Sequence, residues 1–192
     1  MSIIMYLGRN VNEYNEVSKS MIDKYIKEKK ILCEYSLEPM KRHSSYERGL
    51  KDLDEKITII FVQCKKCAKK HGHALLPDFV LRYKRYSGNE IEGVIIDSAS
   101  CPIKEIDTEA SESTVRRWIK QIGSRIVGAV SLLKSIFLEM GRIISELQLN
   151  PGHCYNELEQ ILDREPSVQR YSGNKLGHAN IWLARHNRTS YI

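Results

Sequence analysis

Hydrophobic side chains recur every three or four residues in two long stretches of the chain. This spacing places them on one face of an α-helix. The first stretch covers residues 11–30, and the lysines near its end suit the negative end of a helix dipole. The second begins at residue 126 and continues to about residue 148, where Asn150-Pro151-Gly152 ends it. The pattern therefore predicts two long amphipathic helices.

Shorter elements are expected between and around these helices. Residues 2–7 and the β-branched run at residues 57–63 predict strands, and little helix is expected over residues 31–81. Four short helices are predicted, at residues 89–97, 102–110, 113–122 and 155–162. The fold class is accordingly α+β, with a small β region followed by a mainly α-helical C-terminal half.

Positive charge is concentrated in one part of the chain. The 192 residues carry a formal net charge of +6, and residues 64–85 alone carry the same charge because Asp78 is their only acidic residue. The basic residues of this segment are Lys65, Lys66, Lys69, Lys70, Arg82, Lys84 and Arg85. A local excess of cations favours a polyanionic partner. The alternative is a solvated basic loop.

Composition excludes some classes of protein. A hydrophobic content of 42% is too high for a wholly disordered chain. No apolar run reaches the roughly 20 residues that span a bilayer, and residues 1–6 lack the basic segment of a signal peptide. We expect a cytoplasmic, nucleoid-associated protein with no membrane partner, and nothing in the sequence indicates a small-molecule substrate.

Three cysteines have the spacing of a metal site. Cys64 and Cys67 form a C-x-x-C pair directly after the predicted strand, and two such thiolates can bind one zinc ion. Upstream, Cys33 begins a similar segment in which Ser36 takes the place of the second cysteine, and a neutral hydroxyl is a poor zinc ligand. The candidates for the fourth ligand are His43, His71 and His73. We expect a zinc site formed by Cys33, Cys64, Cys67 and His73; the alternatives are a site that has lost its metal and a Cys33 that is only a small buried side chain.

The three short helices at residues 89–122 suggest a helix-turn-helix. In the last of them, Val115 and Trp118 are expected to face inward, with Ser111 as the N-cap. A recognition helix presents polar and basic side chains to the major groove. The residues expected to contact DNA here are Ser113, Thr114, Arg116, Arg117 and Lys120. The alternative is a surface amphipathic helix with Trp118 in the core.

Several ordered segments resemble those of an uncharacterised bacterial family found mainly in Firmicutes and often linked to mobile elements. The segments are residues 40–48 (MKRHSSYER), 64–67 (CKKC), 73–79 (HALLPDF), 83–87 (YKRYS), 113–118 (STVRRW) and 171–177 (YSGNKLG). The resemblance implies a zinc-ribbon-like region, a helix-turn-helix and a transposase-like or unknown function. The chain departs from the family at Ser36, where the pattern is Cys-Pro-x-Cys, and at His71-Gly72-His73, where one histidine is usual.

These features predict four segments. They are an N-terminal strand and helix (1–30), a degenerate zinc-ribbon-like region (31–86), a helix-turn-helix (87–123), and a long helix with a helical tail (124–192).

Three functions are consistent with these features. The leading hypothesis is a protein that binds double-stranded DNA, as a mobile-element factor or a transcriptional regulator. The second is a metal-dependent transposase or recombinase, for which the acidic candidates are Asp78, Asp97, Asp107 and Glu109, although no catalytic motif contains them. The third is an interaction module or homodimer formed through the long helix, whose alternative is packing against the N-terminal helix of the same chain.

Overall fold

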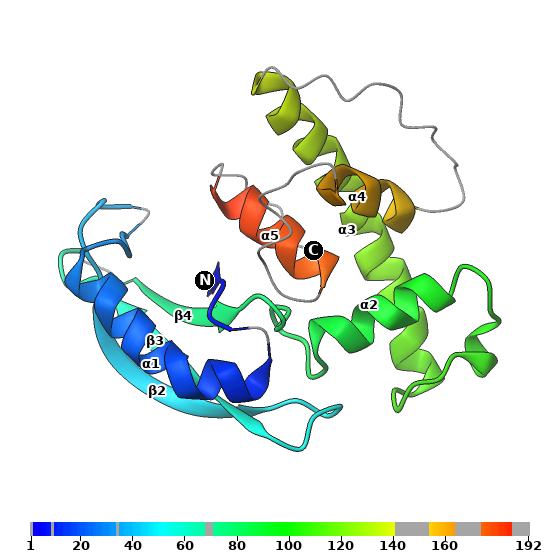
Figure 1. The fold of residues 1–192 in the computed structure, drawn as a ribbon, viewed down its shortest axis with the longest axis horizontal. Coiled ribbons are helices and arrows are strands. Elements are labelled where there is room, and N and C mark those ends of the chain that lie inside the picture. Colours follow the sequence, from blue (N-terminus) through cyan, green and yellow to red (C-terminus); the bar gives the residue numbers. More distant parts are fainter. Residues whose placement is uncertain are drawn as a thin grey trace.

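The computed structural model describes residues 2–8, 10–33, 35–67, 71–140, 154–163 and 174–185. It confirms the α+β class: a four-stranded mixed sheet on the N-terminal side precedes a mainly helical C-terminal half (Figure 1). Each half has its own hydrophobic cluster, and the chain passes from one cluster to the other between Val80 and Leu81.

The sheet contains β1 (Ser2–Met5), β2 (Lys41–Gly49), β3 (Lys56–Gln63) and β4 (Gly72–Pro77) in the order β1-β4-β3-β2. β1 runs parallel to β4, and the other neighbours are antiparallel. The strand predicted at residues 57–63 is confirmed as β3. Because β1 pairs with β4, the N-terminal strand and the cysteine-containing region build one sheet rather than two separate units.

Helix α1 (Val11–Lys27) covers this sheet. Asn10 caps its first turn by accepting a hydrogen bond from the backbone N–H of Glu13 at 2.9 Å. The buried face of α1 meets the sheet, and the Tyr14 hydroxyl donates to the carbonyl oxygen of Thr58 at 2.8 Å. α1 therefore packs on the sheet, whereas the sequence suggested the long helix as its neighbour.

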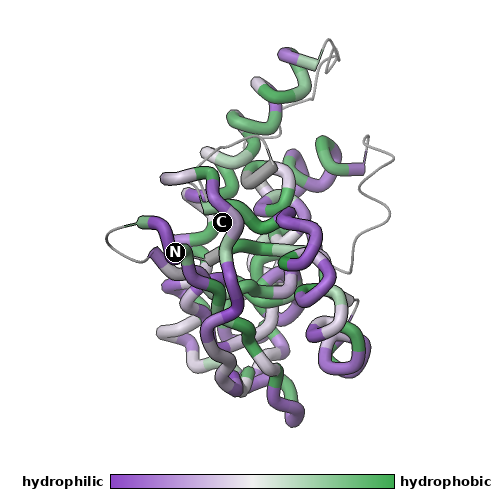
Figure 2. The backbone as a smooth tube through the Cα atoms, turned by 90° about the vertical axis from the view of Figure 1, so that its left-hand side faces the viewer, coloured by the Kyte–Doolittle hydropathy of each residue, from purple (hydrophilic) through white to green (hydrophobic). Residues whose placement is uncertain are grey.

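The C-terminal half is built around α3 (Glu112–Glu139), with α2 (Gly88–Asp97), α4 (Cys154–Asp163) and α5 (Lys175–Arg185) packed against it. The hydropathy along the backbone alternates within these helices, as expected for helices with one apolar face (Figure 2). α3 has the length and apolar composition of a membrane-spanning helix, a property that core helices also have. Its apolar face, from Val115 to Phe137, lies in the helical core.

The region predicted as a helix-turn-helix differs in two ways from the expectation. The helix expected at residues 102–110 is a single 3₁₀ turn, η1 (Ile103–Glu105), so that residues 98–111 connect α2 to α3. The usual turn of a helix-turn-helix has three or four residues. In addition, the helices expected at 113–122 and from 126 are one continuous helix, because Ile122 and Ile126 lie on the same buried face across Gly123. The predicted continuation to about residue 148 lies outside the described residues.

The two halves meet where α5 lies beside β1 and the turn after β4 (Figure 1). At this contact, a Cβ atom on Gly177 would overlap the backbone carbonyl oxygen of Asp78. The buried Asn174 side chain accepts a hydrogen bond from the Gly177 N–H at 2.6 Å. Only glycine permits this close approach between the helix and the turn.

Candidate basic groove and metal centre

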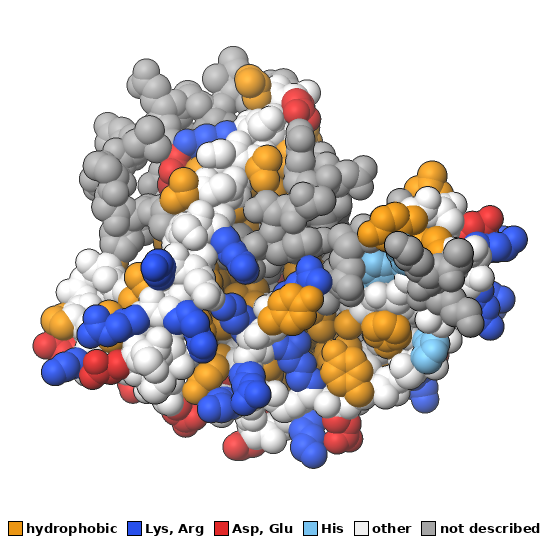
Figure 3. Space-filling model, turned by 180° about the vertical axis from the view of Figure 1, so that it is seen from behind, with side chains coloured by type: hydrophobic (Ala, Val, Ile, Leu, Met, Phe, Trp, Pro, Cys, Tyr) orange, Lys and Arg blue, Asp and Glu red, His pale blue; other side chains and the backbone are white. Residues whose placement is uncertain are grey.

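A groove of about 720 Å³ lies between the loop that follows Leu81 and the first half of α3. Six cationic side chains and one carboxylate line it: Lys51, Arg82, Lys84, Arg85, Arg117, Arg125 and Glu109. Figure 3 shows Lys and Arg side chains gathered on the face seen from behind, while acidic side chains lie mainly toward the lower and outer edges. The groove therefore combines concave shape with a strong excess of positive charge.

The loop that forms one wall of the groove is fixed to the β2–β3 hairpin. Arg48 of β2 donates from Nη2 to the carbonyl oxygens of Leu81, at 3.3 Å, and of Lys84. The Lys51 N–H donates to the Arg85 carbonyl oxygen at 2.8 Å. These bonds hold the basic loop in a defined conformation although its own side chains are largely at the surface.

The opposite wall is one face of α3. Thr114, Arg117, Gln121 and Arg125 all line the groove, and their spacing of three and four residues places them along one side of the helix. Lys84 links the two walls, because its Nζ donates to Oε1 of Gln121 at 3.3 Å.

Two buried aromatic rings support the groove from below. Trp118 and Tyr86 are 2% and 7% exposed, and their rings meet edge to face with centroids 4.9 Å apart. The Lys51 Nζ lies 5.7 Å from the centre of the Tyr86 ring. The sequence prediction that Trp118 belongs to the core is confirmed, and its ring packs against Tyr86, which Lys51 approaches.

The cations in the groove repel one another. Burial lowers the pKa of the Lys84 ammonium, and the nearby charges of Arg125 and Arg117 lower it further. A polyanion in the groove would offset this repulsion.

The structure divides the residues predicted to contact DNA. Arg82, Lys84, Arg85, Thr114 and Arg117 line the groove. The other described members are exposed and lie elsewhere: Lys65 and Lys66 beside the cysteine cluster, and Ser113, Arg116 and Lys120 on α3 outside the groove. Lys69 and Lys70 lie outside the described residues.

Lys51 and Arg125 line the groove but were missed by sequence reasoning. Arg125 follows Thr114, Arg117 and Gln121 at helical spacing, a signal that was present in the sequence. Lys51 reaches the groove through the hairpin turn, and no local pattern indicates this.

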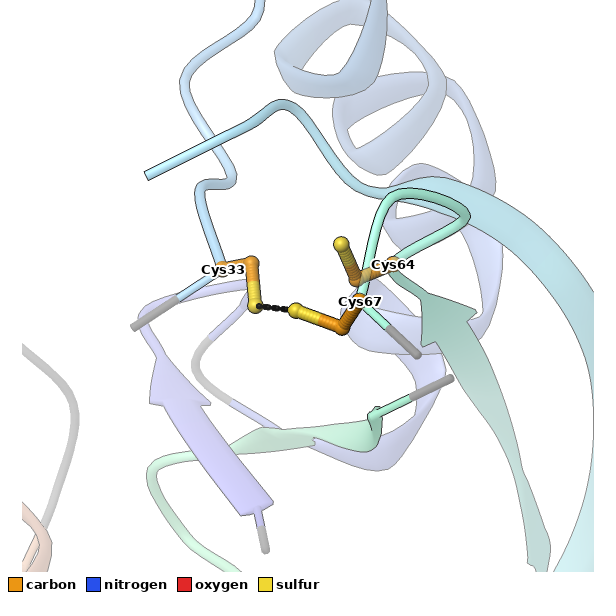
Figure 4. A group of neighbouring side chains, drawn as sticks. All are labelled: Cys33, Cys64 and Cys67. Carbon is orange, nitrogen blue, oxygen red and sulfur yellow. Dashed lines mark hydrogen bonds between the residues drawn. The ribbon is translucent and has the colours of Figure 1, made fainter. Parts of the chain in front are cut away.

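The second candidate site is the cysteine cluster at the opposite end of the β2–β3 hairpin. The Sγ atoms of Cys33, Cys64 and Cys67 all lie within 4.8 Å of one another, as the sequence predicted. Cys33 comes from the loop before β2, the other two come from the loop after β3, and the Sγ atoms of Cys33 and Cys67 point toward each other at 3.5 Å (Figure 4). Backbone hydrogen bonds close each loop, from the Leu37 N–H to the Cys33 carbonyl oxygen and from the Cys64 N–H to the His71 carbonyl oxygen, both at 2.8 Å.

Ser36 lies beside the three thiols. Its Oγ is 3.3 Å from the Cys64 Sγ. The hydrogen bond with Ser36 has the largest effect on the Cys64 thiol and one from the Cys67 backbone the next largest, and together they lower its pKa to about 6. The predicted ligand His73 is buried in β4, opposite Val62, and is not a member of the cluster. The group beside the thiols is therefore Ser36, the position at which the chain departs from the two-cysteine pattern.

Two separations in this cluster are close to those expected around a tetrahedral ion. With Zn–S bonds of about 2.3 Å and Zn–O bonds of about 2.0 Å, tetrahedral geometry requires S–S and S–O separations of about 3.8 and 3.5 Å. The Cys33–Cys67 and Ser36–Cys64 separations, 3.5 and 3.3 Å, are close to these values. The three thiols therefore have the chemistry and the spacing to hold a metal ion, and Ser36 lies beside them.

The acidic residues considered for catalysis do not converge within the described residues. Asp78 is buried in the turn after β4, Asp97 ends α2, Asp107 is exposed in the connection to α3, and Glu109 lies in the basic groove. In the described part of the chain, the cysteine cluster is the group that has metal-binding spacing.

Comparison with known proteins identifies one domain. Residues 33–118 match a family described as a domain of unknown function, DUF6431, which fits the sequence-based resemblance to an uncharacterised family. The matched region contains the cysteine cluster, β2 to β4, α2 and the beginning of α3 through Trp118. No curated protein and no solved structure matches the chain.

Proposed function

We propose that this protein binds DNA and that the basic groove is the contact surface. The observation that carries the proposal is the lining of the groove, where six cationic side chains from three separate parts of the chain surround one carboxylate. Among the described residues that line the groove, Glu109 is the only one of opposite charge. Phosphate groups would balance the cations, and the release of condensed counterions from DNA would favour binding.

The form of the groove suits a DNA backbone. One wall is the loop at residues 82–85, and the other is the side of α3 that carries Arg117 and Arg125. Arginine side chains on a helix can contact phosphates or base edges, while cations on the neighbouring loop fix the position of the strand. A role in transcriptional regulation or with a mobile element is consistent with such a surface.

The experiment is fluorescence anisotropy of labelled duplex DNA over a range of salt concentrations. Arg117→Ala removes a groove cation, whereas Arg116→Ala removes its neighbour on α3, which is exposed outside the groove and lies 3.7 Å from Glu112. We expect Arg117→Ala to weaken binding and to reduce the slope of log affinity against log salt by about 0.9, the value for one phosphate contact. Arg116→Ala should keep the wild-type slope. Equal slopes for the wild type and both variants would show that Arg117 does not contact DNA and would refute the groove as the contact surface.

We also propose that the cysteine cluster binds zinc and that Ser36 lies at the fourth position of the site. The ion would join the loop before β2 to the loop after β3 and would stabilise the end of the sheet. β3 has eight residues, so the site is about 26 Å along the hairpin from the groove. At that separation zinc would act on the fold and not on bound DNA.

This proposal is tested by metal analysis of the purified protein, followed by substitution with cobalt, whose visible spectrum reports thiolate ligands. We expect one zinc per chain and loss of the metal in Cys67→Ala, whereas Cys101→Ala, at an exposed cysteine outside the cluster, should keep it. Ser36→Cys should bind zinc more tightly than the wild type because it supplies a fourth thiolate. A protein that takes up no zinc or cobalt would refute the proposal without affecting the groove.

A further inference from the structure

Tyr83 presents its ring to solvent at the edge of the basic groove. With 82% of its surface exposed, it is the most exposed large hydrophobic side chain among the described residues. It lines the groove together with the cations on either side of it, Arg82 and Lys84. An aromatic ring in this position does not contribute appreciably to a hydrophobic core.

The backbone of Tyr83 has an unfavourable conformation. Tyr83 has a φ of 60°, in the left-handed region that favours glycine. It is the third residue of a turn in which the Lys84 N–H donates to the Leu81 carbonyl oxygen at 3.3 Å, and glycine or asparagine is preferred where such a turn needs a positive φ. Arg48 fixes both ends of the turn by donating to the same two residues, Leu81 and Lys84. Such a strained, externally supported residue points to a functional role.

The neighbours of the ring orient it. The Arg82 guanidinium carbon lies 4.6 Å from the ring centre, and Arg82 Nη2 donates to the Tyr83 hydroxyl at 2.6 Å. Arginine and tyrosine side by side form the kind of surface on which nucleic-acid bases stack. The interior base pairs of a duplex are stacked on both faces, so a ring beside the helix has no base face to contact there.

We propose that Tyr83 is a stacking platform for an unpaired base, so that the preferred ligand of the groove is DNA with a single-stranded segment beside a duplex. This inference rests on the proposed DNA-binding function and specifies the substrate class. The cations of the groove would hold the phosphates, and the ring would take the first base that leaves the duplex. A protein partner is the alternative use of an exposed tyrosine, but the surrounding positive charge favours a nucleic acid.

The test compares three DNA probes by fluorescence anisotropy: a blunt duplex, the same duplex with a thymidine overhang, and the same duplex with an abasic overhang. We expect the wild type to prefer the thymidine overhang over the other two. Tyr83→Ala should lose about tenfold in affinity for that probe and should bind the blunt duplex as the wild type does. Tyr83→Phe should retain the preference. Tyr46→Ala, which removes an exposed tyrosine outside the groove, is the matched control and should have no effect.

The outcomes separate this inference from the proposed function. If Tyr83→Ala binds all three probes as the wild type does, while Arg117→Ala still weakens binding, the groove binds phosphates and the stacking role is wrong. The same conclusion follows if the wild type does not distinguish thymidine from abasic overhangs. If the wild type binds no probe, both proposals fail and a protein partner becomes the explanation. Tyr83→Gly removes the ring and relieves the backbone, so it should reproduce the loss seen in Tyr83→Ala in a protein whose fold is not strained.

Discussion

Because the backbone at Tyr83 is strained, we expect the glycine variant at this position to be more stable than the alanine variant, the reverse of the usual order. At most positions glycine is less stable than alanine by about 0.5–1 kcal/mol, because it loses more backbone freedom on folding. At a φ of 60°, an L-residue with a Cβ atom incurs about 1–2 kcal/mol of steric cost that glycine avoids. We therefore expect Tyr83→Gly to be more stable than Tyr83→Ala by about 1 kcal/mol.

The stability that is lost with the Tyr83 ring can be estimated from the area that the side chain buries. Tyr83 is 82% exposed, so of a tyrosine surface of about 200 Å² only about 40 Å² is buried, which is worth about 1 kcal/mol. The contact with Arg82 adds about 0.5 kcal/mol. Relief of the strained φ offsets most of this loss in the glycine variant. Tyr83→Gly should therefore unfold within about 1 kcal/mol of the wild type, which corresponds to a change in Tm of about 2–4 °C.

The assay is urea unfolding of the wild type and of both variants, analysed as the free energy of unfolding. Lys84 supplies the control because it lies in the same turn and lines the same groove, but does not have a positive φ. There we expect the ordinary order, with Lys84→Ala more stable than Lys84→Gly. If Tyr83→Ala is as stable as Tyr83→Gly, or more stable, the backbone at Tyr83 is not strained and its conformation does not point to a function.

Three further predictions concern the fold. Lys29, just beyond the end of α1, has a φ of 55° and is a second strained position. Lys29→Gly should therefore raise the free energy of unfolding in urea by about 1 kcal/mol. DNA binding should be unchanged. Gly177→Ala places a Cβ atom against the Asp78 carbonyl and should lower the Tm, with a cost of about 1–3 kcal/mol; an unchanged Tm would show that the contact is not tight. Burial raises the pKa of Glu92 in the folded protein above its ordinary value near 4.5, although bonds from Tyr155 and the backbone oppose the shift. The folded state then holds the proton more tightly, so this contribution to stability is present at low pH and is lost as the pH rises from 4.5 through the folded pKa. Glu92→Gln should remove that decline when unfolding is followed against pH, and a decline identical to that of the wild type would contradict the assignment.

The features that could be predicted from the sequence are those that depend on neighbours in the chain. The helical spacing of apolar residues identified α1 and the two stretches that form α3, although not their continuity, and the β-branched run identified β3. The C-x-x-C pair and Cys33 identified the thiol cluster, because two thiols already share one tight loop and only a third thiol from a neighbouring loop has to join them. These predictions succeed because local spacing fixes which side of a helix, strand or loop a residue occupies.

Which charged residues lie together depends on the tertiary fold. Sequence position grouped Lys65 and Lys66 with Arg82, but the β3–β4 pairing separates them, and the hairpin turn brings Lys51 to the groove instead. The same holds for the metal centre, where Ser36 and not His73 lies beside the thiols, because β4 directs His73 into the sheet core. Sheet pairing and helix packing join segments that are far apart in the chain, and the sites lie where those segments meet.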